Sequence, residues 1–165
     1  MNEAKPFTIE EAHRHFAKTL NAEVWDLLQQ PERSALENER MLHGAHASCY
    51  HWMQVGTPMH QQRAEWLIAR VCTVLGYPEP ALRHAARCLE LTHEHDHLMH
   101  DFDRAYACEG MARASAMARN LSIALQYITL AEAAALEIQN EEDRGIFLAD
   151  FEGGEWYGAR GEQRE

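Results

Sequence analysis

Four residues between positions 93 and 100 have the types and the spacing of metal ligands. They follow one another at i, i+3, i+4 and i+7: His93, Asp96, His97 and His100. If this segment is helical, the four side chains share one face. Neutral imidazoles and a carboxylate suit a divalent transition metal such as zinc, iron, nickel or manganese. Because no tight signature such as H-E-x-x-H is present, a solvated histidine-rich loop is the alternative.

Histidine–aspartate pairs are a second possible source of chemistry. Two adjacent pairs are of the kind that metal phosphohydrolases use: His95-Asp96 and His100-Asp101. Such enzymes also need a distant histidine and aspartate, for which His51 and Asp143 are candidates, but with 11 histidines in the chain such matches carry little weight. The sequence has no glycine-rich phosphate loop and no nucleophile elbow. We therefore expect a protein that is not an enzyme.

The elements that must position these residues are helices. Long intervals without proline or glycine, rich in alanine, leucine, glutamate and arginine, predict an all-α chain. Seven helices are expected, at about residues 8–30, from 32 or 34 to 55, 59–75, 78–92, 101–119, 121–138 and 141–151. Residues 93–101 are either a loop or the first turns of the fifth helix. We expect one domain over residues 1–152 and a flexible, glycine-containing tail over 153–165.

Two parts of this domain, residues 64–92 and 107–138, repeat each other at an offset of 43 residues. The offset aligns small residues with small residues: Ala64 with Ala107, Ala69 with Ala112, Ala81 with Ala124, and Cys88 with Ala131. Small residues let the two helices of a hairpin approach closely. Stacked hairpins bury a core that no single hairpin can bury. The repeat therefore predicts stacked antiparallel helical hairpins, an α-solenoid.

At these residues the chain resembles the tetratricopeptide repeat (TPR) family. The small residues that fit the family's spacing include Ala69, Gly76, Ala81, Ala85 and Cys88. The interval of 43 residues exceeds the family's usual length of about 34, and Glu65 occupies the family's tryptophan position, one residue before Trp66. The resemblance covers residues 64–138 well and residues 8–55 only loosely. The chain is also similar to a group of small bacterial proteins with this repeat, which implies no particular activity.

The resemblance implies a groove lined by the first helix of each hairpin. The spacing directs six side chains toward it: Arg63, Trp66, Arg70, Tyr106, Glu109 and Arg113. Arg70 and Arg113 occupy the same repeat position, and paired guanidiniums can grip a carboxylate or a phosphate. Ion pairing with neighbouring acids on a solvated face is the alternative for both arginines.

Antiparallel helices would also bring eight of the 11 histidines to one edge of the stack. We expect a polar site with aromatic and charged residues there. Besides the histidines between positions 93 and 100, the edge cluster consists of His51, Trp52, Asp101 and Asp103.

Composition limits the classes of partner. A net charge of −11 argues against nucleic acid and against an anionic membrane surface. No apolar run approaches the length that spans a membrane, and the N-terminus has no apolar signal core, so we expect a cytoplasmic protein. The four cysteines form no C-x-x-C pair, which predicts reduced core residues.

Together these patterns predict a non-enzymatic TPR-like scaffold that binds a protein or peptide partner and needs no cofactor. The alternative is a small-molecule or metal-binding protein, enzymes included, that uses the histidine-rich edge and a divalent transition metal. Because a short solenoid has exposed ends, we also expect a homodimer.

Overall fold

The ends of the helices lie where capping residues place them. Thr8 and Glu11 form a reciprocal capping box at the first helix, and Ser34 and Glu37 form another at the second. Pro58 occupies the first turn of the third helix, which ends at Gly76 in the left-handed conformation (φ 81°). The helix boundaries therefore follow from local chemistry that the sequence displays.

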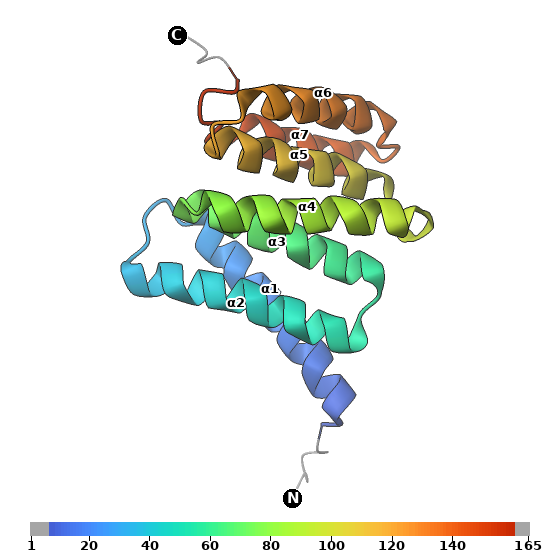
Figure 1. Ribbon diagram of the computed structural model, residues 1–165. Helices are drawn as coiled ribbons and strands as arrows, with labels where there is room; N and C mark the ends of the chain where they lie inside the picture. Colours follow the sequence, from blue (N-terminus) through green and yellow to red (C-terminus); the bar gives the residue numbers. More distant parts are fainter. Residues whose placement is uncertain (1–6, 161–165) are drawn as a thin grey trace, which may run out of the picture.

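The computed structural model describes residues 7–160 and shows an all-helical chain within them (Figure 1). The expected seven α-helices are α1 (Ile9–Gln29), α2 (Ala35–Val55), α3 (Pro58–Leu75), α4 (Pro78–Glu94), α5 (Asp101–Met117), α6 (Leu121–Glu137) and α7 (Glu141–Glu152). A short 3-10 helix, η1 (Asp96–Leu98), lies between α4 and α5. None of the helices in the described part is long and apolar enough to cross a membrane.

Helices adjacent in the sequence pack against each other, most extensively as the pairs α1–α2, α3–α4 and α5–α6. Helix α3 also contacts α5, and α5 contacts α7, so the odd-numbered helices from α3 onward form an inner row (Figure 1). Helices α2, α4 and α6 begin at residues 35, 78 and 121, and so at intervals of 43 residues. The period found in residues 64–138 thus extends to α2, where the residues themselves match poorly.

Small buried residues allow these close helix contacts. Ala64, Ala69 and Ala81 are buried, as are their repeat partners 43 residues later. Cys49, Cys72 and Cys88 are also buried, and all four cysteines are free. Burial raises the pKa of the Cys72 thiol to about 11, which keeps it protonated at neutral pH. Three of the four cysteines are thus buried packing residues, as expected, and Cys108 is partly buried.

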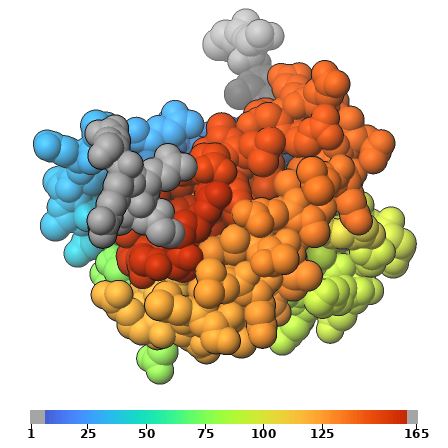
Figure 2. All heavy atoms as spheres, turned by 90° about the horizontal axis from the view of Figure 1, so that it is seen from above, coloured from blue at the N-terminus to red at the C-terminus, as the bar shows by residue number. Residues whose placement is uncertain are grey.

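The C-terminal segment corrects one expectation. The glycines at positions 153, 154 and 158 suggested a flexible tail, but residues 153–160 pack against α3, α5 and α7. Figure 2 shows the end of the described chain, in red, lying against the orange C-terminal helices. Trp156 and Ala159 are buried, and the Tyr157 hydroxyl donates to the Thr73 carbonyl at 2.7 Å. Burial of one large indole and this anchoring bond oppose the flexibility that glycine allows. Positions 161–165, and 1–6 of the expected domain, lie outside the described residues.

The contribution of α7 to the hydrophobic core can be measured at Phe147. Its fully buried ring packs against Tyr106 and Phe151, so Phe147→Ala is expected to lower the free energy of unfolding by about 3–5 kcal/mol. Leu148→Ala is the control on the same helix, because Leu148 is 42% exposed and should change stability much less. Denaturant unfolding followed by circular dichroism measures both. Similar losses in the two variants would contradict this role of Phe147.

Candidate functional site

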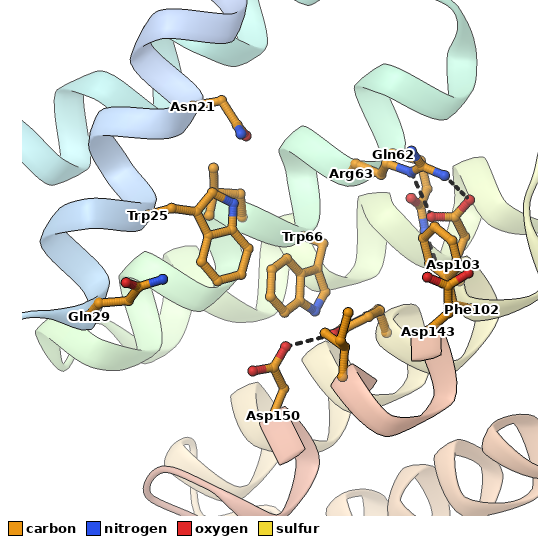
Figure 3. Close-up of a pocket in the computed structure, with 13 residues that line it drawn as sticks. Asn21, Trp25, Gln29, Gln62, Arg63, Trp66, Phe102, Asp103, Asp143 and Asp150 are labelled. Atoms are coloured by element: carbon orange, nitrogen blue, oxygen red, sulfur yellow. Dashed lines mark hydrogen bonds and ion pairs between the residues drawn. The ribbon is translucent and has the colours of Figure 1, made fainter. Parts of the chain in front are cut away.

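The odd-numbered helices enclose a cavity of about 480 Å³, called here the inner cavity (Figure 3). Every one of these helices contributes to its lining. The lining residues are Asn21, Trp25 and Gln29 of α1; Gln62, Arg63, Trp66 and Leu67 of α3; Phe102, Asp103 and Tyr106 of α5; and Asp143, Ile146 and Asp150 of α7. Residues from opposite ends of the chain therefore meet at one concave site.

Trp66 is held in place by α5. Its indole Nε1 donates to Glu109 Oε2 at 3.0 Å. A Cβ atom at position 110 would lie 3.0 Å from the indole, so Gly110 leaves the space that the ring needs. On the other side Trp66 stacks with Trp25 of α1, with ring centroids 5.8 Å apart. The two indoles form an aromatic wall of the inner cavity whose position is fixed from three helices.

Tyr106 joins this wall and links α5 to α7. Its ring meets Trp66 edge-on, with 5.0 Å between centroids, and its hydroxyl donates to Asp150 Oδ2 at 2.6 Å. Burial and this hydrogen bond raise the pKa of Tyr106 above its ordinary value. The phenol therefore stays protonated and continues to donate to the Asp150 carboxylate.

Arg63 lines the cavity as predicted, but its charge is already paired. Its guanidinium donates to both carboxylate oxygens of Asp103, at 2.8 and 3.0 Å, and lies 4.9 Å from the centre of the Phe102 ring. Asp103 is buried and also accepts from the backbone N–H of His100 at the start of α5. This two-bond ion pair fixes α3 against α5.

Arg113, predicted to contact a ligand, is instead buried, with 1% of its surface exposed. Its guanidinium donates to Glu109 and to backbone carbonyls of Asp150, Gly153 and Glu155, and it lies 4.1 Å from the centre of the Trp156 ring. The segment after α7 thus occupies the place where a ligand was expected. Glu109, which accepts from Trp66 and Arg113, is likewise buried and used in holding the structure together.

Arg70 lies beside Arg113, as the shared repeat position predicts. A Cβ atom at position 154 would lie 2.9 Å from Arg70 Nη2 and 3.1 Å from Arg113 Nη1, so both guanidiniums approach the Gly154 backbone. Arg70 lines a smaller hollow of about 150 Å³ next to the inner cavity, together with Glu109 and Asp150. Of the two arginines expected to grip a ligand, only Arg70 lines a hollow.

The structure contradicts the proposed metal-binding face. His93 is in α4, Asp96 and His97 are in η1, and His100 caps α5, so the four residues share no helical face. Asp96 pairs with Arg104, with 2.8 Å between Oδ1 and Nε. Within residues 7–160, no three histidine, cysteine, aspartate or glutamate side chains are grouped so that they could hold a metal ion.

The edge cluster is divided among separate contacts. His51 pairs with His13 at 2.8 Å between their Nδ1 atoms, and the Trp52 ring packs on His60 with centroids 4.3 Å apart. Asp101 accepts from the Gln139 backbone N–H at 2.7 Å, while Asp103 binds Arg63. Each of the four residues therefore makes its own contact between structural elements, and the structure groups none of these contacts into one site.

Sequence reasoning missed the contributions of α1 and α7 to the inner cavity. Trp25, next to the buried Val24 of α1, carried a usable signal, because a large aromatic residue there is expected to lie against another helix. Asp143 was considered only as a catalytic candidate, and nothing in the repeat indicated that α7 lines the cavity.

The chain matches no protein-family model, no curated protein and no solved structure.

Arg113→Met tests how the C-terminal segment is held. The variant leaves Glu109 as a buried, unpaired carboxylate and frees several carbonyls, so a loss of about 3–5 kcal/mol in unfolding free energy is expected. Amide hydrogen exchange should accelerate at residues 153–158. Arg104→Met removes an exposed ion pair from the same helix and should cost less than about 1 kcal/mol. Unchanged protection of residues 153–158 in Arg113→Met would contradict the anchoring role.

His60 makes stability depend on pH. Its Nδ1 accepts from the Thr57 backbone N–H at 3.2 Å, and burial, followed by the nearby Arg63, lowers its pKa. As pH falls through the ordinary histidine value of about 6.5, the unfolded chain binds this proton first, so stability is lost. His60→Gln keeps a capping residue without this titration and should lose less stability between pH 7.5 and 5.5. Thermal unfolding of the parent, of His60→Gln and of the control His93→Gln, which changes an exposed histidine, measures the effect. Identical dependence of the unfolding temperature on pH in the three proteins would refute it.

Proposed function

We propose that the protein is a non-enzymatic binding protein that holds a segment of a partner protein in the inner cavity. The observation that carries the proposal is that four helices, with lining residues between positions 21 and 150, converge on one concave site of about 480 Å³.

We also propose that α1–α2, α3–α4 and α5–α6 are TPR-like hairpins with α7 as the final inner helix. The 43-residue spacing of α2, α4 and α6 supports this assignment.

The chemistry of the lining suits a peptide segment. Trp25, Trp66 and Tyr106 offer flat apolar surface, which accommodates side chains with little loss of conformational entropy. The amides of Asn21 and Gln29 both donate and accept hydrogen bonds, as a peptide backbone requires. Gln29 and Ile146 are exposed and give the segment a place to enter and leave.

A small molecule bound at the same site is the second candidate. The volume of the inner cavity lies in the range of about 300–1,000 Å³ that is typical of small-molecule sites. Both candidate ligands contact the same lining residues, so they differ only in whether the ligand extends beyond the cavity.

Free cysteines support the proposed cytoplasmic location, and the homodimer stays a prediction.

A selection from a displayed random-peptide library tests the peptide hypothesis. Selected peptides should change the fluorescence of the protein, because two of its four tryptophans line the cavity. Ile146→Ala should weaken binding about tenfold, since Ile146 lines the cavity and is 53% exposed. Leu148→Ala, an exposed residue of α7 outside the lining, should bind as the parent does. Failure to select any peptide, or equal affinities of the two variants, would contradict the proposal.

A further inference from the structure

The inner cavity has an excess of negative charge. One arginine and three aspartates line it: Arg63, Asp103, Asp143 and Asp150. Arg63 is neutralised by its two hydrogen bonds to Asp103. Two carboxylates are therefore left without a balancing cation among the lining residues.

These two carboxylates have capacity to accept further hydrogen bonds. Asp143 makes no side-chain hydrogen bond or ion pair with any residue between 7 and 160 that the structure describes. Asp150 accepts from the Tyr106 hydroxyl through Oδ2. Figure 3 shows both aspartates on α7, across the cavity from Trp25. A carboxylate accepts through several lone pairs, so each aspartate can receive a donor from a ligand.

A third acceptor in the lining is unused. Gln62 is 1% exposed, and its Nε2 donates to Thr92 Oγ1 at 3.0 Å and to the Asp103 carbonyl at 3.2 Å. Its Oε1 is the only buried side-chain polar atom of the described residues that has no hydrogen-bond partner. Leaving a buried acceptor unpaired costs stability, so a donor would be favoured there if the surrounding side chains moved to admit it.

The aromatic wall favours the same kind of ligand. Trp25 and Trp66 both line the cavity and stack on each other, and indole rings attract cations more strongly than other aromatic rings do. The protein already uses such contacts elsewhere, with Arg63 over Phe102 and Arg113 over Trp156. Carboxylates with free acceptor capacity and aromatic rings therefore line the same cavity.

We propose that the inner cavity receives a protonated amine or a guanidinium, held against the indoles of Trp25 and Trp66 and by the carboxylates of Asp143 and Asp150. The inference rests on the proposed function, in which the group is a lysine or arginine side chain of the bound segment. A free alkylamine carries the same chemistry. An anion would meet the two carboxylates, and Arg70 lies in the adjoining hollow rather than among the residues that line the inner cavity.

Short alkyl probes with cationic, neutral and anionic head groups test this inference directly. n-Butylammonium and n-butylguanidinium are titrated into ¹⁵N-labelled protein, with n-butanol and butyrate as neutral and anionic counterparts. The two cations should shift the indole N–H signals of Trp25 and Trp66, and the other two probes should not. Equal shifts from n-butanol, or stronger binding of butyrate, would overturn the inference.

Asp143→Asn and Glu142→Gln form the matched pair of variants. Both remove one negative charge from the first turn of α7, but only Asp143 lines the cavity. Asp143→Asn should weaken binding of the cations about tenfold, and Glu142→Gln should leave it unchanged. Equal affinities would overturn the inference. Because the Asp143 side chain makes no contact that folding needs, a folded variant is expected, and its unfolding midpoint verifies this.

Selected peptides then distinguish the source of the cation and separate the two proposals. Lysine-bearing peptides that lose binding when the lysine is acetylated support both the function and the inference. Peptides that bind in an Ile146-dependent way without lysine or arginine uphold the function and overturn the inference. Cation probes that bind in an Asp143-dependent way when no peptide does uphold the inference for a free amine and overturn the peptide function.

Discussion

The buried ion pair of Glu109 and Arg113 connects the inner cavity to the end of the described chain. Glu109 positions the Trp66 indole, and Arg113 binds backbone carbonyls of the segment that follows α7. Burying two charges is costly unless each finds further partners. Here the Trp66 N–H, the carbonyls and the Trp156 ring supply those partners. A network of polar groups on α5 therefore fixes both one wall of the cavity and the closure of the helical stack.

The network lies between two regions of α5: the inner cavity beside Trp66, and the region of Arg113 that the C-terminal segment occupies. The C-terminal segment covers Arg113 and approaches Arg70, which leaves only a hollow of about 150 Å³ there. On the other side, α1 and α7 line the inner cavity around Trp66 from opposite sides (Figure 3). The inner cavity is lined by three aspartates and one arginine, and the smaller hollow by Arg70, Glu109 and Asp150. The lining also holds contacts between helices, since Asp103 binds Arg63 and Asp150 accepts from Tyr106.

Local signals in the sequence were sufficient for the helices and insufficient for the site. Capping residues and Gly76 determine helix ends through neighbours a few residues away, so the seven helices could be predicted closely. Arg113 could not be assigned correctly, since its burial depends on a segment about 40 residues later. The histidines between 93 and 100 were misplaced because η1 interrupts the helical period. Half of the predicted groove residues line the inner cavity, but α1 and α7 contribute residues that no repeat pattern indicated.

We propose that ligands bind among the inner helices rather than on the outer surface of α2, α4 and α6. A crystal structure of the protein with a library-selected peptide distinguishes these two surfaces. We expect density for the peptide between Trp25 and Asp150, with one side chain among the four helices that line the cavity. A peptide bound on the outer helices, with the inner cavity unchanged, would show that the proposed site is wrong.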